Sequence, residues 1–373
     1  MNQWFDFERV AFRDIAVHEN DGWVCNMCYS ALFHFDMSTL DMNFVTELPA
    51  KNVTEYELYG PIEYYEGKLI IAPIRGTDIL IYDINTGSFR QIPVDKMVDV
   101  NCVNLFQKII ICGTKAYFIP GRSHNILCLN LENYSMESVI GIYDLVADKG
   151  YDKIRWLISD AYRDGNVIYM PSWQSNKIIT LDCVTDTVNA ETFGAFKAFS
   201  SCRKFRDALY VTARDTQDIL IIKKENATCV RVVGPEKFLS ERGIRSIFFS
   251  DEKALIIPYK GNMILETDLY FEHFDEYMSL PIDYADEILR MYPDNFSCCK
   301  QLGDGRIVLY SLFEGRIAVL DMKNKTYNFK DTSLNETDYA YVKKYFSDKK
   351  YENIVRETRG TGLNQFLEYI SNI

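Results

Sequence analysis

The sequence lacks several features that would place a protein in a functional class at once. No run of apolar residues reaches the ~18 that a membrane-spanning helix needs, so we expect no membrane contact. The first fourteen residues, "MNQWFDFERVAFRD", show no basic segment followed by an apolar one, so we expect no secretory signal peptide. The stretch Gly360-Thr-Gly362 lacks a following Lys-Ser or Lys-Thr, which excludes a phosphate-binding loop of the usual kind.

Acidic residues outnumber basic residues. The 373 residues include 41 Lys and Arg against 53 Asp and Glu, a formal net charge of −12. Binding to duplex nucleic acid depends on clustered Lys and Arg that neutralise phosphates. The composition therefore predicts no nucleic-acid partner.

Histidines are few, and they are scattered along the chain at His18, His34, His124 and His273. This spacing assembles neither a histidine-rich metal site nor a Ser-His-Asp set. Cys25-Asn-Met-Cys28 has the spacing of a metal knuckle, but no second such pair exists. On an extended strand, residues three apart point to opposite faces, which favours two core cysteines. We expect no metal and no other cofactor.

The ten cysteines include several inside apolar runs, such as Cys112 in "IIICG" and Cys128 in "ILCLN". A buried free thiol behaves there as a small hydrophobic group. Free thiols in such number are typical of a reducing compartment, so we expect a cytoplasmic protein.

What the chain does have is a repeat. "KLIIAPIRGTDILIYDINTGSFRQI" begins at Lys68, and related copies begin at Ala116, Val167 and Ala254. Each copy reads as an apolar strand often closed by Pro, a polar turn, and a second apolar strand ending in Asp. One such unit cannot bury both of its apolar faces alone, and an all-β repeat of 40 to 50 residues stacks side by side as a propeller.

The residue that ends the third strand of each unit gives the number of blades. The series is Asp36, Asp83, Asn130, Asp182, Lys223, Asp268 and Asp321. It predicts an all-β fold, a seven-bladed β-propeller of four-stranded antiparallel blades, over residues 1–328. In the second blade we expect strands at 59–66, 68–73, 78–83 and 88–92. The recurring Asp is expected to bond the amides of the following turn.

After residue 328 the pattern becomes helical, so residues 329–373 are predicted to form a short helical C-terminal tail. Ser333 and Glu336 read as a capping box, and residues 363–370 place an apolar face on a second helical stretch. This face either packs on the propeller or docks a partner. Inserts at 141–155, 233–243 and 271–293 interrupt the repeat, the last with a short helix expected at 284–291.

The blade pattern resembles the kelch, WD40 and quinoprotein-like β-propellers over about residues 10–328. It has neither the paired Gly of kelch repeats nor the Gly-His and Trp-Asp pairs of WD40 repeats. The same strand and turn pattern is similar to propeller proteins of bacteria. The resemblance implies the architecture and a bacterial source, and no particular activity. It leaves open how the ring is closed, for which residues 3–9 are candidates.

The turns after the second strands suggest a binding site. Aligning the copies on Pro73, Pro120, Pro171 and Pro258 brings four side chains to one position, Arg75, Arg122, Trp173 and Lys260; Arg214 falls one place earlier in blade five, and His124 follows Arg122. Such cations at one opening of an acidic protein suit a carboxylate, a phosphate or an acidic peptide. Alternatively, they are solvated turn residues paired with neighbours such as Asp78 or Asp215.

The innermost strands carry mostly small residues at equivalent places, Pro61, Ser159, Ser201, Ser246 and Cys299, with Lys108 as the exception. Crowding at the axis explains them as spacers rather than nucleophiles.

Taken together, the sequence predicts a non-catalytic binding or scaffolding protein whose partner is a protein or an anionic small molecule. The alternative is a propeller enzyme, a lyase or hydrolase, conceivably carbohydrate-active, that acts on an anionic substrate at the channel mouth.

Overall fold

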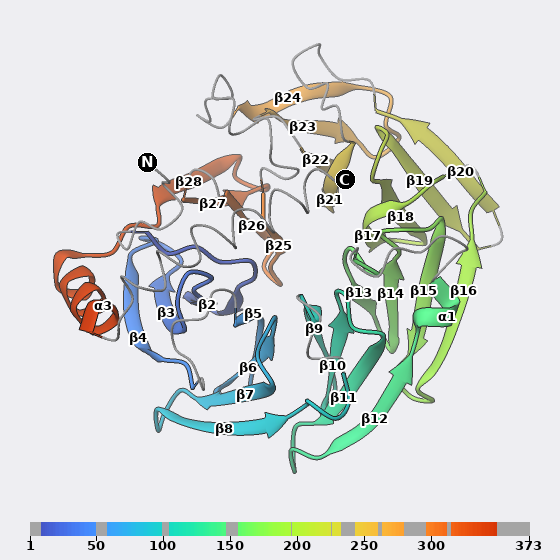
Figure 1. The fold of residues 1–373 in the computed structure, drawn as a ribbon. Coiled ribbons are helices and arrows are strands. Elements are labelled where there is room, and N and C mark those ends of the chain that lie inside the picture. The colour runs from blue at the N-terminus through green and yellow to red at the C-terminus, as the bar shows by residue number, and fades with distance from the viewer. Residues whose placement is uncertain are drawn as a thin grey trace, which may run out of the picture.

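The computed structural model describes residues 9–49, 58–98, 104–146, 156–194, 196–224, 226–232, 243–259, 263–279, 296–311 and 315–348. Seven four-stranded sheets are arranged in a ring, each built from four consecutive antiparallel strands (Figure 1). This is the seven-bladed β-propeller that the repeat predicts.

The four strands of each blade follow one another in the chain without a crossover. Blades one to three are β1 (Ala16–His18), β2 (Asp21–Cys25), β3 (Ala31–Asp36), β4 (Met42–Glu47); β5 (Tyr59–Tyr65), β6 (Lys68–Pro73), β7 (Asp78–Asp83), β8 (Ser88–Pro93); β9 (Phe106–Cys112), β10 (Lys115–Pro120), β11 (Asn125–Asn130), β12 (Met136–Gly141). Blades four and five are β13 (Tyr162–Asp164), β14 (Val167–Pro171), β15 (Lys177–Asp182), β16 (Thr187–Thr192); β17 (Phe199–Phe205), β18 (Ala208–Ala213), β19 (Asp218–Lys223), β20 (Asn226–Arg231). Blades six and seven are β21 (Ile244–Phe249), β22 (Lys253–Pro258), β23 (Met263–Asp268), β24 (Phe274–Ser279); β25 (Cys298–Gln301), β26 (Arg306–Ser311), β27 (Arg316–Asp321), β28 (Thr326–Asp331).

All seven residues that mark the end of a third strand in the sequence do end that strand in the structure. Six of them also accept hydrogen bonds from the following turn; the Oδ1 of Asp182, for example, accepts the amides of Val184 at 2.8 Å and Thr185 at 3.0 Å. The exception is Lys223, whose side chain has no acceptor atom. The repeat-level role of the Asp is therefore confirmed.

The core lies between blades rather than within one of them. Buried residues form seven clusters, most of which join two adjacent blades; one, for example, combines Ile70 and Ala72 of blade two with Phe118 and Leu127 of blade three. Because each sheet buries both faces against its neighbours, the inner strands read as apolar runs rather than as strict alternations.

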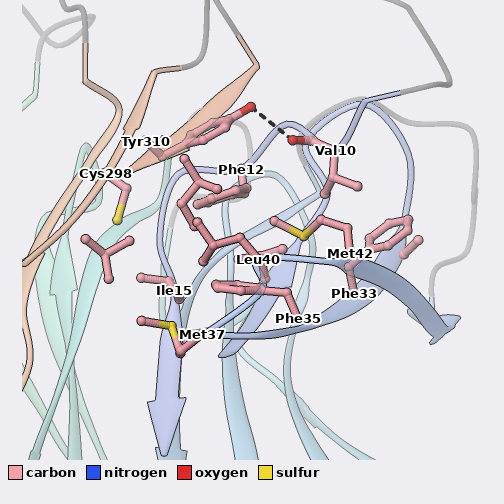
Figure 2. Packing of buried hydrophobic residues seen from close by; sticks show 14 of the residues in the cluster. Val10, Phe12, Ile15, Phe33, Phe35, Met37, Leu40, Met42, Cys298 and Tyr310 are labelled. Carbon is pink, nitrogen blue, oxygen red and sulfur yellow. Dashed lines mark hydrogen bonds between the residues drawn. The ribbon is translucent and has the colours of Figure 1, made fainter. Parts of the chain in front are cut away.

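The ring is closed by an exchange of short segments between the two ends of the described chain (Figure 2). Residues from the N-terminal side pack on blade seven: the Val10 amide donates to Thr332 O at 2.9 Å, and the Tyr310 hydroxyl donates to Val10 O at 3.0 Å. The Phe12 ring stacks on Tyr310 with centroids 3.8 Å apart. All four strands that the structure describes in blade seven come from residues 298–331, and no N-terminal strand is among them. Arg9 forms an isolated bridge to Ser333, and residues 3–8 lie outside the described residues.

The C-terminal segment packs in return on blade one, where the helix α3 (Glu336–Asp348) lies against β4. The Phe44 amide donates to the Asp338 carboxylate at 2.8 Å, and Val342 is fully buried in the cluster of the seam. The expected capping box at Ser333 and Glu336 is wrong by two residues. Asn335 caps the helix instead, since its Oδ1 accepts the Asp338 amide at 2.9 Å while Ser333 pairs with Arg9.

The remaining tail and insert predictions fall largely outside the described residues, among them the helices expected at 284–291 and after residue 360. The first insert begins with the short helix α1 (Tyr143–Val146). Within the described ranges, no helix has the length and apolar character to cross a membrane.

Candidate binding site at the channel mouth

The second strands all end at the same end of the ring, so the turns that follow them gather around one opening of the central channel. We call this opening the mouth. Arg75 is exposed in the turn of blade two, and Arg122 is only 9% exposed in the turn of blade three. His124 packs its ring on Tyr143 of α1, with centroids 4.2 Å apart. Lys260 lies outside the described residues.

Trp173 and Arg214, from the turns of blades four and five, are in direct contact. The Arg214 guanidinium lies 5.0 Å from the centroid of the Trp173 ring, and its Nη1 donates to Trp173 O at 2.7 Å. The same guanidinium makes two hydrogen bonds of 2.9 Å to the Asp215 carboxylate, whose side chain is 44% exposed. Arg214 is thus held on the ring and partly neutralised by an acid at the surface.

This contact is part of a larger set of aromatic rings and guanidinium groups. Ring centroids lie 6.4 Å apart for Trp156 and Trp173, and 6.1 Å apart for Trp173 and Tyr259. Arg13 lies 5.6 Å from the centroid of Trp156, and Arg245 lies 5.6 Å from that of Tyr259. We call these six residues the mouth cluster: Arg13, Trp156, Trp173, Arg214, Arg245 and Tyr259.

The mouth cluster spans several blades because Arg13 reaches far from its own. Arg13 precedes the first strand of blade one, yet its Nη1 donates to the Asn104 side chain of blade three at 2.8 Å. Asn104 adopts a left-handed backbone with φ 61°, and its carbonyl accepts the Arg122 amide at 2.8 Å. The turn of blade three is thereby tied to the cluster.

The sequence prediction found Trp173 and Arg214 and missed the other four residues. Trp156 lies at the end of an insert, Arg245 lies in the innermost strand of blade six, and Arg13 lies before the first repeat. One signal was available: the chain has only 4 Trp, and two of them are here. Tyr259 directly follows Pro258 and so stands one place before the position that was aligned.

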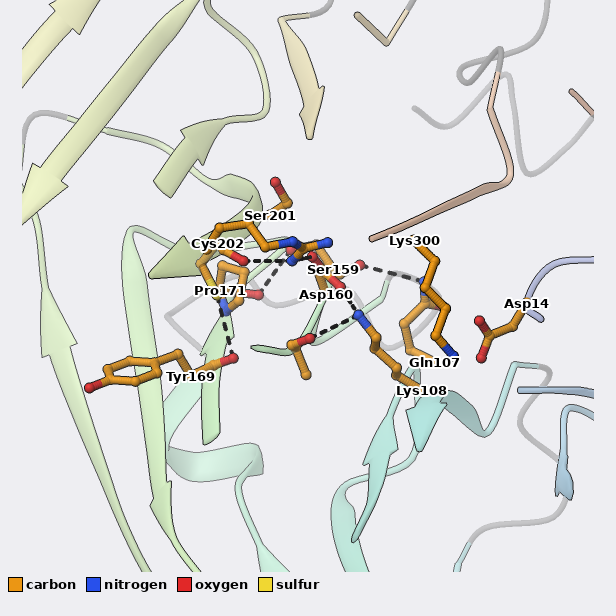
Figure 3. Close-up of polar contacts among 12 residues, drawn as sticks. Asp14, Gln107, Lys108, Ser159, Asp160, Tyr169, Pro171, Ser201, Cys202 and Lys300 are labelled. Atoms are coloured by element: carbon orange, nitrogen blue, oxygen red, sulfur yellow. Dashed lines mark hydrogen bonds and ion pairs between the residues drawn. The ribbon is translucent and has the colours of Figure 1, made fainter. Parts of the chain in front are cut away.

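Below the mouth, ion pairs join side chains from the inner sides of different blades (Figure 3). Asp160 accepts Lys108 Nζ at 2.7 Å and Arg203 Nη1 at 2.6 Å. Across the channel, Lys300 Nζ lies 2.8 Å from the Glu63 carboxylate and donates to Ile15 O at 2.7 Å. Lys108, the exception among the small axial residues, is therefore one partner of an ion-pair network.

These buried charges are well matched. Burial alone would raise the pKa of Asp160, but the charges of Arg203 and Lys108 outweigh it and hold the pKa well below its ordinary value. Burial would lower the pKa of Lys300, and the charges of Glu63 and Asp14 outweigh it and raise that pKa. Three acids (Asp14, Glu63 and Asp160) offset three cations (Lys108, Arg203 and Lys300).

The candidate nucleophiles and metal ligands have structural surroundings. The Ser201 hydroxyl lies 3.0 Å from the Thr212 hydroxyl, both buried. Cys25 and Cys28 belong to two different core clusters, and burial raises the pKa of the Cys25 thiol. In the part of the chain that the structure describes, no group of three or more His, Cys, Asp or Glu side chains is arranged to hold a metal ion.

Comparisons with known proteins support the fold. No family model and no curated protein matches the chain. Among solved structures, virginiamycin B lyase from Staphylococcus aureus is similar with 11% identity and a TM-score of 0.59, covering 84% of this chain and 94% of the lyase. BamB from Moraxella catarrhalis has 13% identity and a TM-score of 0.53, covering 80% of this chain and 81% of BamB. PorZ of Porphyromonas gingivalis has 12% identity and a TM-score of 0.55, covering 87% of this chain and 38% of PorZ. The chain is a β-propeller, and its structural neighbours include a lyase and a component of a secretion system.

Proposed function

We propose that this protein is a non-catalytic binding module whose mouth cluster binds an acidic segment of a protein partner. The observation that supports it most strongly is the pairing of three aromatic rings with three guanidinium groups at one opening of an acidic protein. Three of the five N–H groups of Arg214 donate to Asp215 and Trp173 O within the described residues, which leaves two for a carboxylate, and stacking on the ring limits the conformational entropy lost on binding.

The channel beneath favours a ligand that lies across the mouth rather than one that enters deeply. Its cations are paired with Asp160 and Glu63, which neutralise most of their charge, so they attract an anionic ligand only weakly. The cluster extends over residues from blades one, four, five and six, a span that suits an extended peptide making several contacts. PorZ, a propeller described as a component of a secretion system, gives a precedent for a protein-assembly role.

The cytoplasm is our proposed location. The nine cysteines of the described residues are all free thiols, which supports a reducing compartment without requiring it.

An enzyme acting on an anionic small molecule is the second candidate, because a lyase shares the fold. A histidine-to-alanine variant of that lyase is described as catalytically inactive. In the present chain the predicted mouth histidine, His124, packs against the Tyr143 ring of α1.

The proposal is tested by fluorescence anisotropy with a fluorescein-labelled decaglutamate peptide, with decaglutamine as the neutral probe. We expect decaglutamate to bind and decaglutamine not to bind. Arg214→Gln should weaken the affinity for decaglutamate about tenfold, because it removes one charge-assisted contact. Arg90→Gln is the matched control, because Arg90 also stacks on a tyrosine, Tyr134 at 4.6 Å, but lies in the outer strand of blade two. Equal affinities in wild type and Arg214→Gln would contradict the proposal.

Citrate as competitor separates the two candidates. If citrate at millimolar concentration displaces the peptide, and citrate by itself binds as tightly as decaglutamate does, the site suits a small anion and the peptide proposal is wrong. Charge reversal of Arg122 is a poor test, because a residue only 9% exposed in a packed turn is expected to disturb the fold when its charge is inverted.

A further inference from the structure

Asn104 differs from the other residues of the described chain that have a left-handed backbone. Ten non-glycine residues there have a positive φ, and nine of them lie in hairpins that join the first to the second strand, or the third to the fourth strand, of one blade. Tight hairpin turns commonly need such a conformation. Asn104, with φ 61°, precedes β9 and belongs to no such hairpin. Its conformation is therefore held by contacts at the mouth end of blade three.

Main-chain and side-chain contacts fix Asn104 at this place. Its carbonyl accepts the Arg122 amide at 2.8 Å, and a Cβ at Gly121 would lie 2.4 Å from the same oxygen, so this close approach requires glycine. The side-chain Oδ1 accepts Arg13 Nη1 at 2.8 Å. Because the Arg13 guanidinium lies 5.6 Å from the centroid of the Trp156 ring, the carboxamide of Asn104 lies beside the mouth cluster.

The amide nitrogen of the same carboxamide, Nδ2, meets no hydrogen-bond acceptor among the described residues, although Asn104 is only 7% exposed. A guanidinium can only donate, so the atom that faces Arg13 is the oxygen and the remaining atom is the N–H donor. Buried donors are nearly always paired, because an unpaired one loses its hydration without compensation. A ligand oxygen placed next to Arg13 would supply the acceptor.

The spacing of the rings in the mouth cluster suits an extended polypeptide. The centroids of Trp156 and Trp173 are 6.4 Å apart, and those of Trp173 and Tyr259 are 6.1 Å apart. Side chains on one face of an extended chain repeat every ~6.7 Å, and the main chain between them presents carbonyl oxygens. An extended acidic peptide therefore offers carboxylates to the guanidinium groups and main-chain carbonyls to an amide donor.

We propose that Asn104 Nδ2 donates a hydrogen bond to a main-chain carbonyl of the acidic peptide, which makes the mouth selective for polypeptides over other polyanions. This role of Asn104 rests on the proposed function and adds the chemical class of the ligand. Guanidinium groups attract any polyanion, because charge attraction does not depend on the ligand's backbone. A neutral amide donor distinguishes a ligand that has amide carbonyls from one that has none.

The experiment compares decaglutamate with an oligoacrylate of matching charge, which carries carboxylates on a hydrocarbon backbone and has no amide. Each is titrated as a competitor of fluorescein-labelled decaglutamate in the anisotropy assay, and the readout is the ratio of the two affinities. We expect the wild type to prefer decaglutamate. Asn104→Gly should reduce that preference about fivefold, because it removes one neutral hydrogen bond. Glycine adopts the left-handed backbone of this position without strain.

The ratio separates the hydrogen bond from charge attraction. Asn104→Gly also removes the acceptor of Arg13, but a displaced Arg13 weakens the binding of both probes alike. Arg214→Gln is the matched control, which should weaken both probes and leave their ratio unchanged. Asn104→Asp is the second variant and should also reduce the preference. It keeps an oxygen for Arg13 and tolerates a left-handed backbone, so it decides the question even if Asn104→Gly is unstable.

An unchanged ratio in both Asn104 variants, with decaglutamate still bound, would overturn the role of Asn104 and leave the proposed function standing. Equal affinities of the wild type for decaglutamate and the oligoacrylate would do the same. A wild type that does not bind decaglutamate would overturn the proposed function and the role of Asn104 together.

Discussion

Two arginines of this propeller have different environments, Arg203 in the channel and Arg214 at the mouth. Arg203 is 7% exposed, donates to the Asp160 carboxylate at 2.6 Å, and shares that acid with Lys108. Arg214 has a side chain 23% exposed, rests on the Trp173 ring, and pairs with an acid that is itself 44% exposed. The channel arginine is committed to a partner within the fold, while the mouth arginine meets solvent.

This difference in burial means that the channel arginine contributes to the stability of the fold, while the mouth arginine contributes to binding. A buried charge that loses its partner is costly, because nothing else in the interior can solvate it. A surface pair contributes little, because water and salt screen it. We therefore expect channel substitutions to act on unfolding and mouth substitutions to act on ligand affinity.

Asp160→Asn should have the largest effect. It leaves Arg203 and Lys108 buried without their shared acid, and we expect a loss of about 3–5 kcal/mol in the free energy of unfolding, measured by urea denaturation. Arg214→Gln should cost less than about 1 kcal/mol in the same assay. Similar losses in both variants would remove the distinction between channel and mouth.

The pH dependence of stability sharpens the same comparison. The folded-state pKa of Asp160 is lowered, so its contribution is fully present above the unfolded-state pKa of about 3.9 and is lost as pH falls toward the folded-state value. Wild-type stability should fall more steeply than that of Asp160→Asn below about pH 4. Parallel curves in a series of urea melts would show that Asp160 is not linked to folding in this way.

Trp173→Ala should act at the mouth. Losing the ring removes the support of Arg214 and one packing face of Tyr259, and we expect decaglutamate affinity to drop about tenfold. Trp23→Phe, in the middle of β2 and outside the mouth cluster, is the control and should bind as the wild type does. An unchanged affinity in Trp173→Ala would place the site elsewhere.

Asp215→Asn should have the smallest effect and the opposite sign. It frees Arg214 from a competing carboxylate, so affinity for decaglutamate should rise by up to about fivefold while stability changes little. A weaker affinity in an anisotropy titration would indicate that Asp215 positions Arg214 for its ligand instead of competing with it.

The fold could be predicted in detail because the same strand and turn pattern, with two apolar faces to bury, recurs seven times. Each third strand ends at the expected residue, and the strands of blade two differ from prediction by at most one residue at an end. The helix cap was misplaced because Ser333 is drawn into the seam by Arg9, a contact between residues at opposite ends of the described chain. Repeat periodicity holds no information on such a contact.

The candidate site could be predicted only in part, for the same reason. Trp173 and Arg214 occupy repeat positions, so alignment of the copies found them. Arg13 and Trp156 lie outside the repeats and meet because the ring lets Arg13 reach residues of the third and fourth blades. Alignment also grouped Arg122 with the exposed Arg75, although Arg122 itself is buried in its turn.

The most direct test of the mouth as the binding site uses tryptophan emission. In a variant with Trp4→Phe and Trp23→Phe, Trp156 and Trp173 are the two remaining indoles of the sequence. The account predicts a saturable change in emission on titration with unlabelled decaglutamate, with a midpoint equal to the anisotropy Kd. Binding seen by anisotropy with no change in this emission would contradict it.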